Sequence, residues 1–150
     1  LVGSEMCIRD RVAAAGNNGP KDKSITIPGL CRKIITVGSS DDEEGEVKNL
    51  GLMRGYSGRG PTEACIMKPE VVAPGTAIVS CKRMGNGYEM KSGTSMATPV
   101  VAGAVAVLLS RYSNLKPAEV KLRLYETSVD TGKSKHAQGW GRLDVMQLIR

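Results

Sequence analysis

The chain has 150 residues, of which 41% are hydrophobic and 24% charged, a composition typical of about one globular domain. Its net charge of +6 comes from basic residues scattered along the chain, and aromatic residues make up only 3%. We therefore expect no nucleic-acid binding, because a basic stripe and stacking aromatic side chains are both lacking. We also expect no membrane span, because the apolar stretch 96–110 is shorter than the roughly 20 residues that cross a bilayer.

Short apolar runs alternate with turn residues from residue 12 onward. Runs rich in small or β-branched residues predict buried strands at residues 12–15, 34–37 and 71–73. Further short strands at 78–80 and 88–91 flank Gly85-Asn86-Gly87, which predicts a hairpin turn. The acidic stretch 40–45 is interpreted as an exposed loop.

Three helices are expected in the second half of the chain. Residues 95–111 form the main one, and apolar residues on all its faces predict burial inside the domain. Pro99 lies in its first turns, where a missing N–H costs least. A second helix is expected to start at Pro117, and a short last helix after the N-cap residue Asp144. The whole pattern predicts an α/β fold.

Residues 93–99 bring a glycine turn and a serine to the start of the main helix. The first N–H groups of a helix lack intrahelical acceptors and carry the positive end of its dipole. Ser95 is therefore placed to act as a nucleophile whose developing oxyanion meets backbone donors. A plain N-cap serine is the alternative interpretation of the same pattern.

Five segments in this order resemble those of the subtilisin-like serine proteases, the subtilases: AAAGN at 13–17, YSGRGP at 56–61, KPEVVAPG at 68–75, GTSMATP at 93–99 and GWGRLDV at 139–145. The resemblance implies a three-layer subtilisin-like fold with a mostly parallel sheet and a buried central helix that starts at the nucleophile. It also implies a serine-type endopeptidase that hydrolyses peptide bonds of a polypeptide substrate through an acyl-enzyme.

The resemblance assigns roles to individual residues. Ser95 matches the nucleophile, and its own N–H would supply half of the oxyanion hole. The side-chain amide of Asn17 matches the other half, although a turn residue is the alternative there. Thr94 would add a hydroxyl beside them. The substrate side chain would meet a pocket lined by Ala13, Ala14, Ala15 and Gly16, with Thr26 at its floor.

A catalytic triad also needs a base and a carboxylate that orients it. In the family both precede the asparagine segment, whereas the single histidine here, His136, follows Ser95. We interpret His136 as a surface histidine. We expect residues 1–11 to be a non-native leader and 12–150 to be the C-terminal portion of a subtilase peptidase domain, inactive alone.

Several alternatives stay open at this stage. A non-catalytic subtilase homologue would act as a binding or signalling module. A nucleotide-binding domain is disfavoured, because 58–60 holds a lone Gly-x-Gly. The chemistry requires no cofactor. A structural calcium ion would suit the family, but the carboxylates at 41–44 are interpreted as a solvated loop rather than a cage. The family suggests an extracellular location, with an intracellular or spore-associated one as the alternative.

Overall fold

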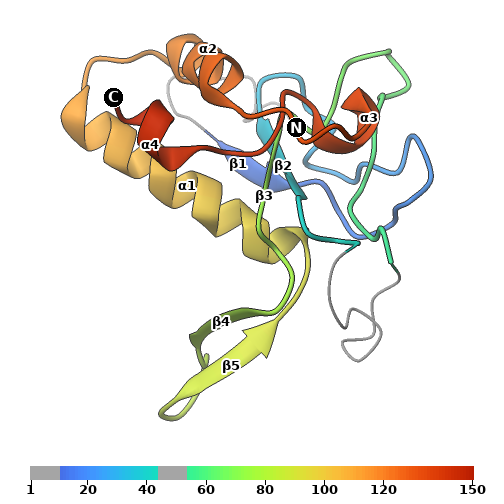
Figure 1. Ribbon diagram of the computed structural model, residues 1–150, viewed down its shortest axis with the longest axis vertical. Coiled ribbons are helices and arrows are strands. Elements are labelled where there is room, and N and C mark those ends of the chain that lie inside the picture. The colour runs from blue at the N-terminus through green and yellow to red at the C-terminus, as the bar shows by residue number, and fades with distance from the viewer. Residues whose placement is uncertain (1–10, 44–53) are drawn as a thin grey trace.

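The computed structural model describes residues 11–43 and 54–150. Its centre is a parallel three-stranded sheet in the order β1-β2-β3 (Figure 1), made of Val12–Ala14, Ile35–Ser39 and Val71–Ala73. The predicted strands are thus confirmed to within two residues. Every residue of the central strand β2 is buried, because this strand has a neighbour on each side.

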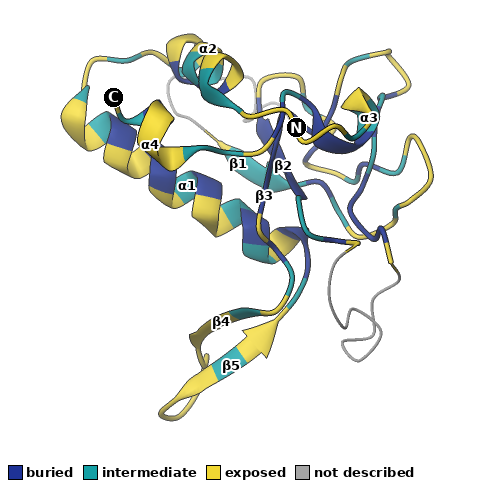
Figure 2. Cartoon of the chain, in the orientation of Figure 1, coloured by how far each residue is buried: buried dark blue, intermediate teal, exposed yellow. Residues whose placement is uncertain are grey.

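The main helix α1 (Thr94–Arg111) packs along this sheet and contacts all three strands. Figure 2 shows a buried stripe along α1 with exposed residues on the opposite side. The buried stripe has helical spacing and consists of Thr94, Ala97, Val101, Ala104, Val105 and Leu108. On the other side, Val100 is 36% and Val107 50% exposed. The expectation of a helix buried on every face is therefore wrong for the described chain, because the sheet covers one side only.

The length of α1 bears on the expectation that no segment spans a membrane. The helix has 18 residues, more than the stretch 96–110, and its length and composition alone would allow it to cross a bilayer. The core helix of a soluble protein passes the same test. α1 packs against β1, β2 and β3 on one side, and 33% of the helix is buried.

The predicted hairpin is confirmed as β4 (Ile78–Cys81) and β5 (Tyr88–Lys91), which pair antiparallel and project from the body of the molecule (Figure 1). The predicted helix at Pro117 is α2 (Pro117–Thr127), with proline in its first turn. The last helix, α4 (Val145–Leu148), begins after Asp144, whose side chain accepts from Gln147 N–H as an N-cap should.

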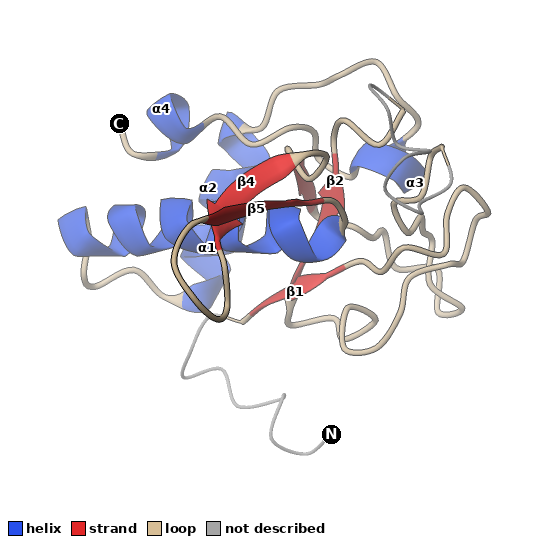
Figure 3. Cartoon of the chain, turned by 90° about the horizontal axis from the view of Figure 1, so that it is seen from below, coloured by secondary structure: helices blue, strands red, loops and turns tan. Residues whose placement is uncertain are grey.

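Figure 3 shows α1, α2 and α4 together at one end of the molecule and the short helix α3 (Lys135–Gln138) at the other. Pattern analysis did not predict α3. Helix α4 contacts both α1 and α2, so these three helices form one group. The opposite end holds α3 together with loops.

The segment after α3 lies beside β3 and extends the sheet. Leu143 N–H donates to Val72 O at 2.9 Å, and Val72 N–H donates to Gly141 O at 3.0 Å. A Cβ on Gly139 would lie 2.1 Å from Pro69 O, and one on Gly141 would lie 2.4 Å from a backbone oxygen of the adjacent strand-like segment. Only glycine permits these approaches, which explains the Gly-Trp-Gly pattern in physical terms.

A buried ion cluster supports the start of β2. The Lys68 ammonium is fully buried and lies 2.7 Å from Glu70 Oε1, and Lys121 of α2 reaches the same oxygen at 2.8 Å. Lys68 also donates to Ile34 O and to the Thr36 hydroxyl. Burial lowers the pKa of Lys68, and the Glu70 carboxylate opposes that shift.

The acidic loop departs from the sequence expectation. Asp42 is only 2% exposed, where its carboxylate accepts from Ser57 N–H and from Lys133 Nζ. Asp41 is half-buried and hydrogen-bonded to the turn after β3. The interpretation of these two residues as part of a solvated loop is wrong, because both carboxylates accept hydrogen bonds from backbone N–H groups of distant segments. Glu43 is exposed, as expected, and Glu44 lies outside the described residues.

Replacing Glu70 by Gln should destabilise the protein strongly, because the Lys68 ammonium then stays buried without its counter-charge. The expected loss is about 3–5 kcal/mol of unfolding free energy, measured by urea denaturation. Glu63→Gln is the control, because Glu63 pairs with Lys23 at an exposed site and should cost less than about 1 kcal/mol. Equal effects of the two substitutions would contradict the structural role of the cluster.

Candidate active site

The loop after β1 and the start of α1 meet at the carboxyl end of the sheet. Asn17 Oδ1 accepts from Thr94 N–H at 3.0 Å and from the Thr94 hydroxyl at 3.0 Å. The Thr94 oxygen in turn accepts from Gly16 N–H at 3.1 Å. Thr94 is fully buried. The fold therefore brings Thr94 to Gly16 and Asn17, which precede it by 78 and 77 residues in the sequence.

These contacts determine which way the Asn17 amide points. A backbone N–H can only donate, so the side-chain atom that faces Thr94 N must be the oxygen. The amide nitrogen, Nδ2, then lies on the other side, and no acceptor for it occurs among the described residues. A Cβ on Gly93 would lie 3.0 Å from this nitrogen. Asn17 thus holds a spare N–H donor next to the residue that precedes the helix.

A second spare donor lies in the first turn of α1. Thr94 N–H bonds to Asn17, and the N–H groups of Met96 and Ala97 point to Gly93 O. Within residues 11–43 and 54–150, Ser95 N–H has no hydrogen-bond acceptor. Ser95 is exposed to solvent. A hydroxyl, a free backbone N–H and the positive end of a helix dipole therefore coincide at this residue.

Such a set of groups suits the chemistry of acyl transfer. A serine hydroxyl can attack a carbonyl carbon, and N–H donors that are already in place can stabilise the negative oxygen that forms. Glycine at position 93 lets the Asn17 amide lie close to the backbone before α1. A side chain there is disfavoured by the φ of 142° and by the nearby Asn17 nitrogen. The contact between Gly93 and Asn17 was missing from the sequence interpretation, although an isolated glycine before a helix is a signal of close approach.

The residues expected to bind the substrate side chain also lie together. Ala13 and Ala14 belong to β1, and Ala15 follows them in the core. Thr26 N–H donates to Ala15 O at 2.9 Å. A Cβ on Gly16 would lie only 2.4 Å from Thr26 Oγ1. Thr26 is therefore packed against the end of β1, and a role for this group in substrate binding stays a prediction.

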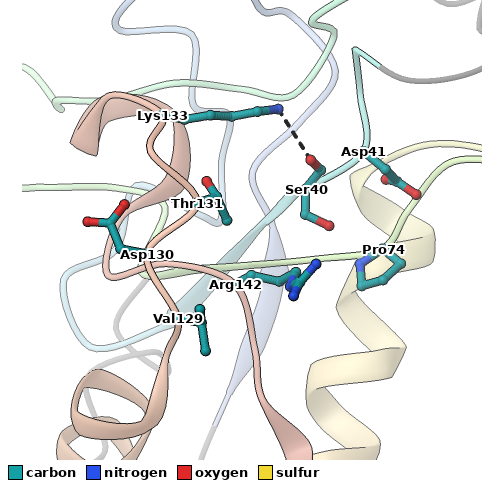
Figure 4. A pocket seen from close by; sticks show the side chains of 8 residues that line it. All are labelled: Ser40, Asp41, Pro74, Val129, Asp130, Thr131, Lys133 and Arg142. Carbon is teal, nitrogen blue, oxygen red and sulfur yellow. Dashed lines mark hydrogen bonds between the residues drawn. The ribbon is translucent and has the colours of Figure 1, made fainter.

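A separate hollow of about 470 Å³ lies beyond the carboxyl ends of β2 and β3 (Figure 4). Its lining is mostly polar and consists of Ser40, Asp41, Pro74, Val129, Asp130, Thr131, Lys133 and Arg142. Lys133 Nζ donates to Ser40 O across it. None of the predicted site residues lines this hollow.

His136 lies on α3, about half-exposed, and its Nδ1 is 3.3 Å from Asp22 Oδ2. This position agrees with its interpretation as a surface histidine. The chain has no other histidine, and no ion pair or hydrogen bond joins His136 to Ser95 among the described residues. Residues 11–43 and 54–150 also hold no cluster of three or more His, Cys, Asp or Glu side chains that could ligate a metal ion.

Comparison with known proteins matches the sequence profile of the subtilase family to residues 10–141. The serine protease AprX of Bacillus subtilis is 37% identical, over 85% of this chain and 32% of its own length. The halolysin-like extracellular serine protease Nep of Natrialba magadii is 36% identical, over 89% of this chain and 22% of its own length. The chain thus spans less than a third of either relative.

A solved structure agrees with these matches. The prenylagaramide maturation protease PagA superposes with a TM-score of 0.71 and 27% sequence identity, covering 92% of this chain and 48% of that one. The α/β architecture, with its parallel sheet and its helix that begins at Thr94, is therefore that of subtilisin-like proteases.

Substituting Thr94 by Val tests the contact that joins the two segments. Valine keeps the shape but leaves Gly16 N–H without its acceptor and Asn17 without one donor, so we expect a loss of about 1–3 kcal/mol in unfolding free energy. Thr98→Val is the control, because the Thr98 hydroxyl bonds only to a carbonyl of its own helix. Equal losses of unfolding free energy in the two variants would show that the hydrogen bonds of Thr94 to Gly16 and Asn17 contribute no more than the bond of Thr98 within its helix.

Proposed function

Since the chain belongs to the subtilase family, we propose that it carries the nucleophile and the oxyanion donors of a serine-type endopeptidase. Ser95 Oγ attacks the carbonyl carbon of a peptide bond, and an acyl-enzyme forms when the amine leaves. Water then attacks the ester and releases the second product. Ser95 N–H and Asn17 Nδ2 hold the negative oxygen in both steps.

One observation carries this proposal. Among residues 11–43 and 54–150, Ser95 N–H has no acceptor while the other N–H groups of the first turn are bonded, and the oxygen of the neighbouring Asn17 amide faces Thr94. Donors that are ordered before the reaction cost no reorganisation when charge develops, which makes them effective in catalysis. A simple N-cap serine would not require a locked asparagine beside it.

The proposal needs a general base, which we place outside these 150 residues. The single histidine of the chain contacts Asp22 instead of Ser95, so a histidine and a carboxylate from another part of the protein would complete the triad. These residues alone would then be inactive. If no such base exists, the second candidate applies: a non-catalytic subtilase homologue that acts as a binding or signalling module. The contact of His136 with Asp22 agrees with that candidate as well.

The substrate is proposed to be a polypeptide whose side chain packs on Ala13, Ala14, Ala15 and Gly16. The hydroxyl of Thr26 lies against Gly16 and would make this pocket shallow. Thr94 would act by holding Asn17. No cofactor takes part in the chemistry. An extracellular location is proposed, in line with the description of the Natrialba magadii relative as an extracellular protease.

Ser95→Ala in the full-length protein that contains these residues should abolish labelling by a fluorophosphonate probe, because the reacting oxygen is lost. Gel fluorescence and mass spectrometry of the labelled peptide measure the result. Ser110→Ala is the matched control: its hydroxyl bonds to a carbonyl of α1, and labelling should be unchanged. Labelling that persists in the Ser95 variant would identify another nucleophile.

Asn17→Leu should lower kcat by about 100-fold or more with little change in KM, because the donor acts on the transition state. That magnitude is the one known for the oxyanion asparagine of subtilisin itself, a member of the same family. Asn18→Leu, at the exposed neighbouring position, should keep kcat within about 3-fold. A loss confined to KM would mean that Asn17 serves only as a turn residue.

A further inference from the structure

The turn after β3, residues 74–76, is held by the carboxylate of Asp41. Asp41 Oδ1 accepts from Gly75 N–H at 2.8 Å, and both carboxylate oxygens lie 3.1 Å from Thr76 N. The Ser39 hydroxyl donates to the same Oδ1 at 2.8 Å. Hydrogen bonds to an ionised carboxylate are stronger than neutral ones. The turn is therefore tied firmly to the end of β2.

A second layer of contacts reinforces this attachment. The Tyr56 hydroxyl lies 2.9 Å from Ser39 Oγ and 3.0 Å from Thr76 Oγ1. Tyr56 is fully buried, and burial raises its pKa, so the phenol stays neutral and keeps its proton. Thr76 Oγ1 also donates to Asp41 O at 2.9 Å. Because the Ser39 and Thr76 hydroxyls already donate to Asp41, the single Tyr56 proton bonds to one of these two oxygens at a time.

The turn bears directly on the start of α1. Gly93 N–H donates to Gly75 O at 2.9 Å. A Cβ on Gly75 would lie 2.9 Å from Gly93 O and 3.2 Å from Ala97 Cβ, so the two backbones are in close contact. On its other side Gly93 lies against the Asn17 amide. Gly93 is therefore enclosed between the Asp41-bound turn and the proposed oxyanion donor, and only Thr94 separates it from Ser95.

From this geometry we propose that Asp41 is a positioning residue for the nucleophile, an inference that rests on the proposed function. Asp41 does not touch the reacting atoms. It holds Gly75, which holds Gly93, and Gly93 determines where α1 begins and where the Ser95 hydroxyl and N–H point relative to Asn17. Displacements of about 1 Å at reacting groups can cost about 100-fold in rate, so a loosened turn lowers turnover even when the protein stays folded.

The adjacent Asp42 provides a matched control. Its carboxylate accepts from Ser57 N–H at 3.2 Å and from Lys133 Nζ at 3.1 Å, away from the 74–76 turn. It is only 2% exposed. Removing it should therefore destabilise the fold without changing the helix start. Figure 4 shows Asp41 and Lys133, the side chain that donates to Asp42, on opposite sides of Ser40.

The test uses the full-length protein, with active sites counted by titration so that only folded molecules contribute. Asp41→Ala should lower kcat and the rate of fluorophosphonate labelling by at least about 10-fold, with KM within about 3-fold. Asp41→Asn keeps one acceptor oxygen for Gly75 N–H and should recover most of the loss. Asp42→Ala should lower the melting temperature but keep kcat per active site within about 2-fold.

Two results would overturn the inference. Asp41→Ala with wild-type turnover per active site, or with the same turnover as Asp42→Ala, would reduce Asp41 to a structural residue. If Asp41→Ala does not fold, Asp41→Glu keeps the charge but displaces the turn, and an unchanged kcat in that variant would equally refute the role. A wild-type protein that is not labelled at Ser95 would instead overturn the proposed function and, with it, the role of Asp41.

Discussion

The candidate site depends on the hydrogen bonds between Thr94 and the loop after β1. They join Gly16 and Asn17 to the first residue of α1, although almost 80 residues separate them in the sequence. One buried threonine thereby determines the direction of an amide side chain and ties the start of the helix to the loop after β1. Without this contact, Ser95 would be an ordinary exposed serine at a helix N-terminus.

The rest of the fold serves to keep these two segments in place. Parallel pairing of β1, β2 and β3 brings their carboxyl ends to one edge, and α1 packs against the sheet through its buried stripe, which runs from Thr94 to Leu108. At the opposite end of β2, the buried cluster around Lys68 and Glu70 supplies the acceptors and donors that the strand start needs. Ser95 therefore lies on a helix packed against the sheet, and Asn17 lies in a loop that hydrogen bonds tie to the start of that helix.

Local patterns predicted the strands, the hairpin and the helix starts, because apolar periodicity and turn residues act over a few neighbours. The five segments that resemble those of the subtilases pointed to Ser95 and Asn17. Contacts between distant segments were beyond such patterns. The burial of Asp42 depends on Ser57 and Lys133, and that of Lys68 on its partners in other elements. The exposed side of α1 was misjudged for the same reason, since composition cannot say which face has a neighbour.

The most direct measurement is a crystal structure of the full-length protein with a peptidyl boronic acid, which mimics the tetrahedral intermediate. We expect a covalent bond from Ser95 Oγ to boron, and a boronate oxygen about 3 Å from both Ser95 N and Asn17 Nδ2. An inhibitor bound to another side chain, or a boronate oxygen turned away from Asn17 with Thr94 still bonded to it, would contradict the assignment of this site.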